Sequence, residues 1–164
     1  MAEVLLRARL VERGGDFPVV ASAGTMVEGR NRATSTAVEV LSSSGIDLSE
    51  HMSSPLTAGL VVGADLIVVM TRLHEATICT LDPTARSRTF LVGEVVRLGG
   101  QVGPRGDRSL VDWIRSLDGA RGGHFTAGRV ADELADPLGE PEDSYKRCAD
   151  RLDGICTRLA SLVI

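Results

Sequence analysis

Apolar residues recur at helical intervals in several parts of the chain. Near the N-terminus this spacing predicts a helix that ends at Gly14, and further helices are predicted over 36–43 and 73–81. The longest helical pattern lies at the C-terminus. Its apolar positions are Tyr145, Cys148, Ala149, Leu152, Ile155, Cys156, Leu159 and Leu162. This spacing predicts a long C-terminal helix with one buried face.

Three shorter apolar runs predict strands. Phe17–Ala21 is one of them, with Pro18 at the start or at a sheet edge. Ala64–Thr71 contains the uninterrupted apolar run Leu66–Met70, which is typical of a parallel strand buried on both faces. Thr89–Val96 is the third. Strands that alternate with helices indicate an α/β protein with a parallel sheet that helices cover on both faces.

The composition changes between residues 97 and 128, where glycine becomes frequent. Inside this segment, Leu110, Trp113, Ile114 and Leu117 keep a helical spacing. We therefore expect a short helix between two flexible loops. The chain of 164 residues has the length of one domain, so we interpret residues 1–164 as a single domain with a glycine-rich insertion at about 97–128.

Charge and cysteine content exclude several classes of protein. The net charge of −4 argues against nucleic-acid binding. No apolar stretch approaches the length of about 18 residues that a membrane span needs, and charged residues interrupt the N-terminal apolar positions of a possible signal peptide. Three cysteines without a CxxC pair indicate a reducing compartment, so a cytoplasmic location is predicted.

Several segments, taken in order, resemble the low-molecular-weight protein tyrosine phosphatase family. They are the opening Met1–Leu10, Ala21–Thr25, Gly45–His51, Ala64–Met70, and Ala135–Gly139 followed by Tyr145. The resemblance covers nearly the whole chain outside 97–128. It implies a three-layer, flavodoxin-like, doubly wound parallel sheet. It also implies hydrolysis of phosphomonoesters on phosphotyrosine proteins or of small phosphomonoesters, without a cofactor or a metal.

In this family a cysteine thiolate of a Cys-x5-Arg loop attacks phosphorus, and the loop amides and arginine bind the phosphoryl oxygens. None of the three cysteines has arginine six residues later: Ala85 follows Cys79, Gly154 follows Cys148 and Leu162 follows Cys156. The sequence begins where the loop of the family would end. We therefore expect the nucleophile, the loop arginine and the first, central strand to be missing. This chain is predicted to be inactive and able to self-associate through the exposed sheet.

By resemblance, Asp136 is the general acid that protonates the leaving phenolate. Asp82-Pro83 is the same dipeptide without that role, because Asp-Pro commonly forms a turn. Leu138 stands where many members carry an aromatic residue that contacts the phosphotyrosine ring. Trp113 or Phe125 could replace that contact, although packing is the simpler interpretation of each.

Other functions stay open. Without the loop, the chain could serve as a non-catalytic, phosphatase-like binding scaffold. Cys79 could suggest the related arsenate reductases, but their relay needs a cysteine pair and Cys79 is alone. His51, His74 and His124 have no metal-binding spacing and are interpreted as structural or solvated.

Overall fold

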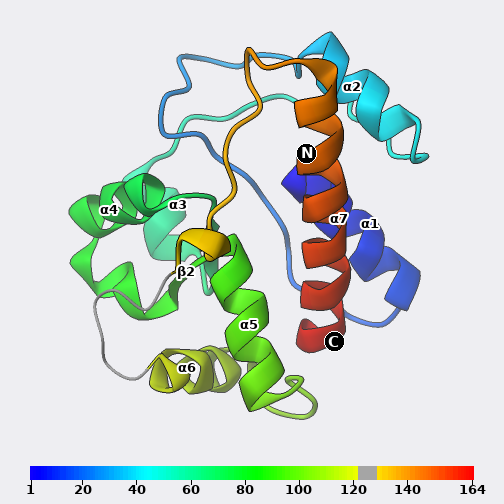
Figure 1. Ribbon diagram of the computed structural model, residues 1–164. Coiled ribbons are helices and arrows are strands. Elements are labelled where there is room, and N and C mark those ends of the chain that lie inside the picture. The colour runs from blue at the N-terminus through cyan, green and yellow to red at the C-terminus, as the bar shows by residue number, and fades with distance from the viewer. Residues whose placement is uncertain (122–128) are drawn as a thin grey trace. The chain divides into compact units, whose positions relative to one another are not determined.

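The computed structural model describes residues 1–121 and 129–164, and the chain divides into two compact units (Figure 1). The first unit comprises Met1–Leu56 and Asp136–Ala160, and the second comprises Thr57–Ala135 and Ser161–Ile164. The elements are α1 (Ala2–Arg13), α2 (Ser35–Ser42), α3 (Ala58–Gly63), β1 (Ile67–Val69), α4 (Arg72–Leu81), η1 (Pro83–Arg88), β2 (Thr89–Leu91), α5 (Val92–Val102), α6 (Leu110–Ala120), η2 (Val130–Asp132) and α7 (Glu142–Val163).

In the first unit, α1 packs beside α7 (Figure 1). Leu5 and Leu10 form the buried face of α1, whereas Val11 is 62% exposed. The Arg9 guanidinium donates two hydrogen bonds to the Asp153 carboxylate of α7, at 2.7 and 2.8 Å. Such a two-point contact fixes the orientation of the two helices as well as their separation.

The C-terminal helix is confirmed. α7 covers the whole predicted segment, and seven of the eight predicted apolar positions are less than 10% exposed. They are Tyr145, Cys148, Ala149, Leu152, Cys156, Leu159 and Leu162. The helices predicted over 36–43 and 73–81 are confirmed as α2 and α4, each shifted by one residue at its start. Thr34 and Thr71 cap these helices with their side-chain oxygens.

In the second unit, β1 and β2 form a parallel pair in which Ile67 lies opposite Thr89 and Val69 lies opposite Leu91. The helix α4 connects them along the chain, which gives a β–α–β order. The α/β class is therefore confirmed, with a small parallel sheet and many helices. Both strands are shorter than predicted, and Ile67 and Val68 in β1 are only half-buried.

Two predicted strands need correction. Residues 92–96 lie in α5, because the Leu91 N–H donates to the Glu94 carboxylate at 3.2 Å and this capping contact starts a helix. Phe17–Ala21 has no regular structure, and the side chain of Val19 is 96% exposed. Among the described residues no strand pairs with this segment, so its backbone cannot form a ladder.

The helix predicted inside 97–128 is confirmed as α6. Trp113 and Leu117 are fully buried, and the Trp113 indole N–H donates to the Gly103 carbonyl at 3.0 Å. Gly103 has φ +79°, a conformation that glycine adopts without strain. The first predicted loop is partly wrong, because α5 extends to Val102 and residues 97–102 are therefore helical. That it is an insertion stays a prediction.

At the end of α6, Arg121 and Glu94 form a buried ion pair with side chains 3% and 2% exposed. The Arg121 Nε donates to Glu94 at 3.1 Å, and Nη1 donates to Asp118 at 3.0 Å and to the Arg86 carbonyl at 3.2 Å. Nη2 donates to the Thr89 carbonyl. The guanidinium also lies 4.1 Å from the centre of a neighbouring phenylalanine ring in β2. One side chain thus links α5, α6, η1 and β2.

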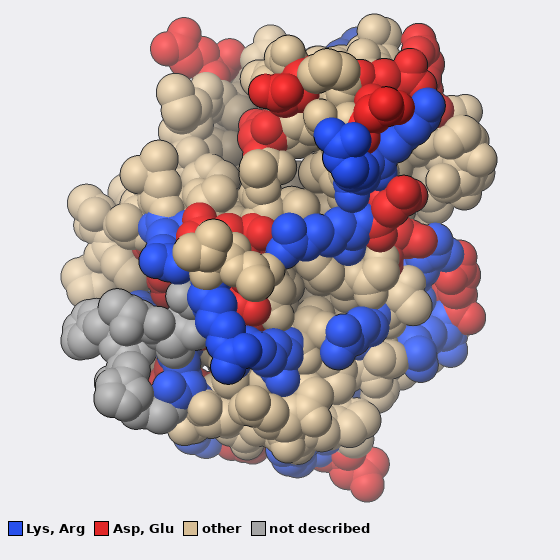
Figure 2. Space-filling view, viewed as in Figure 1, with Lys and Arg blue, Asp and Glu red and all other residues tan. Residues whose placement is uncertain are grey.

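Surface charges are arranged in short-range pairs. Exposed examples are Arg115 with Asp112 at 2.6 Å and Lys146 with Glu142 at 2.7 Å. Figure 2 shows acidic and basic side chains next to one another over the face drawn. Within the described part of the chain, no helix combines the length and apolar character that crossing a bilayer requires.

Candidate functional site

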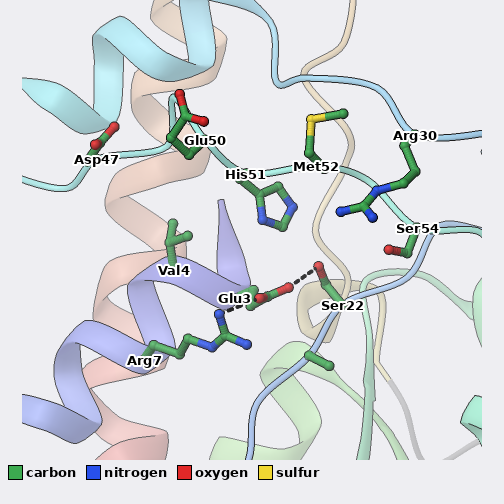
Figure 3. A pocket seen from close by; sticks show the side chains of 11 residues that line it. Glu3, Val4, Arg7, Ser22, Arg30, Asp47, Glu50, His51, Met52 and Ser54 are labelled. Atoms are coloured by element: carbon green, nitrogen blue, oxygen red, sulfur yellow. Dashed lines mark hydrogen bonds and ion pairs between the residues drawn. The ribbon is translucent and has the colours of Figure 1, made fainter.

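The first unit contains a cavity of about 430 Å³ beside the N-terminal half of α1 (Figure 3). It is lined by Glu3, Val4, Arg7, Ala21, Ser22, Arg30, Asp47, Glu50, His51, Met52 and Ser54. Several of these residues lie in segments that carry the family resemblance. The cavity brings together residues from three stretches that are far apart in the sequence.

One wall of the cavity is held by side-chain contacts of α1. The Ser22 hydroxyl donates to the Glu3 carboxylate at 2.5 Å, and Arg7 forms an ion pair with the same carboxylate at 2.8 Å (Figure 3). Arg7 Nε also donates to the Val20 carbonyl at 3.1 Å. The Ala21–Thr25 segment therefore follows the surface of α1 although it forms no strand.

The opposite wall is held by backbone contacts. Arg32 and Met52 form an isolated antiparallel bridge, and the Ser53 N–H donates to the Asn31 carbonyl at 2.9 Å. The Gly24 N–H donates to the Ser54 carbonyl at 2.9 Å on the other side of the segment. Residues 52–54 are thus fixed from both sides, which positions the side chains that line the cavity.

Each acidic residue of the cavity has a partner. Glu3 is engaged as described, and Glu50 pairs with Arg32 at 3.2 Å. The Asp47 carboxylate accepts the Ser49 N–H at 2.8 Å, and this backbone hydrogen bond lowers the pKa of Asp47. The charged form of Asp47 is therefore favoured by this contact.

Asp136 is exposed and begins a turn ahead of α7. Its carboxylate accepts the Leu138 N–H at 3.0 Å, and the Glu140 N–H donates to the Pro137 carbonyl at 2.9 Å. Gly139 has φ +82° and completes the turn. Neither Asp136 nor Leu138 is among the residues that line the cavity, and Leu138 is 68% exposed.

The other Asp-Pro pair differs in its contacts. Asp82 forms a similar turn, since its carboxylate accepts the Thr84 N–H at 2.9 Å. It also forms an ion pair with Arg88 at 3.0 Å, and its side chain is only 16% exposed. Asp136 is exposed and has no ion pair to any described residue. This difference was not visible in the sequence.

The segment that leads to Asp136 is anchored within the second unit. The Leu134 N–H donates to the Met70 carbonyl at 2.8 Å, just beyond β1. Asp132 pairs with Arg97 at 2.8 Å; burial opposes its ionisation, but Arg97 and the Arg129 N–H outweigh burial and lower the pKa of Asp132. Gly93 allows the close approach, because a Cβ there would lie 2.7 Å from the Asp132 Cα.

The three cysteines are placed as structural residues. Cys148 and Cys156 lie on the buried face of α7, and Cys156 donates a weak hydrogen bond to the Ala2 carbonyl at 3.8 Å. Burial raises the pKa of all three thiols, and that of Cys156 reaches about 12. A nucleophilic cysteine needs a lowered pKa so that its thiol is ionised at neutral pH. The raised pKa values of these three thiols therefore do not fit a nucleophile.

We predict that this burial slows thiol modification in the folded chain. At pH 8 only about one in 10⁴ Cys156 thiols is ionised when the pKa is near 12. Cys79, which is half-buried, should react first with Ellman's reagent, and Cys156 last. The measurement is the time course in buffer compared with that in urea, where all three should react together. Equal rates for Cys79 and Cys156 in buffer would contradict the placement.

The histidine and aromatic residues singled out from the sequence lie in different parts of the structure. His51, interpreted from the sequence as structural or solvated, lines the cavity, and only its position beside a family motif could have indicated this. Trp113 lies in the core of the second unit, where it is fully buried. His124 and Phe125 lie outside the described residues. Within 1–121 and 129–164, no group of His, Cys, Asp or Glu side chains is arranged to hold a metal ion.

The sequence of this chain is similar to those of known phosphatases. Residues 1–100 match the family described as low molecular weight phosphotyrosine protein phosphatase. The chain is similar to a protein-arginine-phosphatase of Bacillus subtilis (strain 168), with 31% identity over 160 residues, 98% of this chain and 85% of that protein. It is also similar to AmsI of Erwinia amylovora, a probable low molecular weight protein-tyrosine-phosphatase, with 36% identity over 91 residues. That match covers 56% of this chain and 60% of AmsI.

Solved structures agree with the sequence matches. A YwlE mutant from Bacillus subtilis superposes with a TM-score of 0.69 at 29% identity, covering 97% of this chain and 85% of that one. A low molecular weight protein tyrosine phosphatase from T. tengcongensis gives a TM-score of 0.69 at 26% identity, covering 96% and 86%. The chain therefore belongs to the low molecular weight phosphotyrosine protein phosphatase family.

Proposed function

We propose that this chain is a phosphatase-family protein for phosphotyrosine proteins with Asp136 as the general acid, and that the 164 residues alone do not catalyse the reaction. The observation that carries this proposal is Asp136, an exposed carboxylate without an ion pair to any described residue, in the Asp-Pro turn ahead of α7. Family membership supports the assignment, and the absence of a Cys-x5-Arg sequence from the 164 residues supports the lack of turnover.

The proposed chemistry has two steps, as the family resemblance implies. A thiolate from a Cys-x5-Arg loop forms a bond to phosphorus while the bond from phosphorus to the tyrosine oxygen breaks, and Asp136 donates its proton to that oxygen. The Asp136 carboxylate then accepts a proton from water. The water oxygen bonds to phosphorus, the phosphorus–sulfur bond breaks, and phosphate and the thiolate are released.

Phosphoarginine is a second candidate substrate. The relative that matches over 98% of this chain is named a protein-arginine-phosphatase, whereas the match to AmsI covers 56%. In that reaction Asp136 would protonate a guanidino nitrogen instead of a phenolate oxygen. Leu138, exposed two residues after Asp136, is proposed to contact the substrate side chain in either case.

The remaining expectations stay proposals. A central strand absent from these residues would account for the irregular Phe17–Ala21 segment and for the exposure of Val19, and an incomplete sheet favours self-association. We also propose that the two units are parts of one phosphatase-like domain and that the protein is cytoplasmic. A non-catalytic scaffold remains the alternative, and arsenate reduction is less supported because Cys79 has no partner cysteine beside it among the described residues.

The test compares two forms of the protein. The 164-residue chain should hydrolyse neither p-nitrophenyl phosphate nor phosphotyrosine or phosphoarginine peptides, whereas a form extended by a strand and Cys-x5-Arg-Ser-Pro should hydrolyse at least one peptide class. Vanadate, which mimics phosphate, should inhibit the extended form. Vanadate-sensitive hydrolysis by the 164 residues would contradict the proposal, and so would an extended form that folds but stays inactive on all three substrates.

A further inference from the structure

Around the cavity beside α1, the acidic side chains have hydrogen-bond or ion-pair partners, whereas two basic side chains have none among the described residues. Its carboxylates are each engaged: Glu3 by Ser22 and Arg7, Glu50 by Arg32 and Asp47 by a backbone N–H. The Arg30 guanidinium and the His51 ring have no hydrogen-bond or ion-pair partner in the described part of the chain. The cavity therefore presents unused donors around Arg30 and His51, and Asp47, whose carboxylate has a neutral N–H partner, lies at the other end of the cavity from Arg30 (Figure 3).

The backbone places the Arg30 and His51 side chains on the same cavity. The Arg32–Met52 bridge and the hydrogen bond from the Ser53 N–H to the Asn31 carbonyl hold residues 30–32 beside residues 52–54, and the Arg30 side chain lines the cavity together with Met52 and Ser54. Figure 3 shows the Arg30 guanidinium extending toward the His51 ring, with the Ser54 hydroxyl nearby. Since residues 52–54 are fixed on two sides, little ordering is needed before a ligand binds.

We infer that this cavity binds an anionic group of the protein substrate, a phosphoryl group or a carboxylate, through Arg30, His51 and Ser54. The inference rests on the proposed function for the identity of the substrate. Arginine supplies a planar fork of donors that matches both kinds of oxyanion, and a hydroxyl and an imidazole can complete the contacts.

A cationic ligand fits the same cavity poorly. Beside Arg30 and His51 it would have to compete with Arg7 for Glu3 or with Arg32 for Glu50, whereas an anion there breaks no internal pair. Glu3 repels an anion only weakly, because Arg7 and the Ser22 hydroxyl offset its charge. The arrangement therefore favours an anion.

The experiment titrates the ¹⁵N-labelled 164-residue chain with inorganic phosphate at constant ionic strength, followed by NMR. Saturable shifts are expected at the His51 ring and at the amides of Arg30 and residues 51–54, in the millimolar range typical of a few contacts. Arg30→Gln should weaken binding by about five- to tenfold, and Arg30→Lys by less. His51→Gln should also weaken it.

The matched control is Arg13→Gln, which removes the same charge from an exposed position at the end of α1 that does not line the cavity. It should leave phosphate affinity unchanged. A second titration with glutarate, a dicarboxylate, distinguishes a phosphoryl ligand from a carboxylate ligand. If phosphate binds and glutarate does not, the site is specific for a phosphoryl group. If both bind with similar affinity, the site also accepts a carboxylate.

The inference is overturned if shifts do not saturate, or if Arg30→Gln and Arg13→Gln reduce affinity equally while the spectrum of Arg30→Gln shows the native fold. Because anion binding needs no nucleophile, this result is independent of the activity assay. An extended form that hydrolyses phosphopeptides while phosphate fails to bind here would refute the anion site alone.

Discussion

Replacing Asp136 by Asn in a form that carries a Cys-x5-Arg loop is expected to lower kcat on a phosphotyrosine peptide by about 10²–10⁴-fold, the usual contribution of a general acid. Asparagine keeps the turn, because its side-chain oxygen can still accept the Leu138 N–H at the position where Asp136 accepts it at 3.0 Å. It cannot donate the proton that the leaving group needs.

The leaving group provides an internal check on this prediction. The phenol of tyrosine has a pKa of about 10 and leaves poorly without a proton. The more acidic p-nitrophenol leaves readily, so the Asp136→Asn effect should be much smaller on p-nitrophenyl phosphate. A purely structural role would lower both rates alike.

Asp82→Asn is the matched control, since it alters the same dipeptide in a similar turn. Asp82 is committed to Arg88, so this change should affect stability and leave kcat nearly unaltered. Steady-state kinetics of the two variants on both substrates are the measurement. If Asp82→Asn and Asp136→Asn lose equal activity, Asp136 is not the acid.

Arg121→Met is expected to destabilise the chain by about 3–5 kcal/mol, because it leaves the Glu94 carboxylate buried without its partner. The substitution also removes the hydrogen bonds from Arg121 to the Arg86 and Thr89 carbonyls. The measurement is the free energy of unfolding from urea denaturation. Adding Glu94→Leu to Arg121→Met should recover part of the loss, because the uncompensated charge is then gone.

Arg115→Met serves as the comparison in the same helix. Arg115 pairs with Asp112 at 2.6 Å, but both side chains are more than half exposed. Its loss should change the free energy of unfolding little, because water screens such a pair. Equal destabilisation by the two substitutions would show that burial does not strengthen the Arg121 network.

The features that depend on neighbours in the sequence were predicted best. The buried face of α7 follows directly from apolar spacing, since a helix repeats every 3.6 residues whatever its surroundings. The Asp-Pro turn ahead of it is equally local. Capping contacts of Thr34 and Thr71 involve residues only three positions away, so the starts of α2 and α4 were predictable within one residue.

Strands were predicted less well because their existence depends on partners. Phe17–Ala21 has a strand-like composition, yet no described strand lies beside it. Val92–Val96 is rich in β-branched residues, but the Glu94 cap at Leu91 starts a helix instead. Its valines at 92, 95 and 96 also fit a helical period, a signal that the apolar run concealed.

The sequence by itself determined the family motifs, the helical faces, the Asp-Pro turn and the lack of a Cys-x5-Arg among these residues. Tertiary structure alone decided which charged groups are committed and which are available. Among the described residues, Asp82 is paired and Asp136 is not; Glu3 is engaged and Arg30 is not. The reason is physical: helical periodicity arises between neighbours in sequence, whereas an ion pair or a cavity arises between segments that only folding brings together.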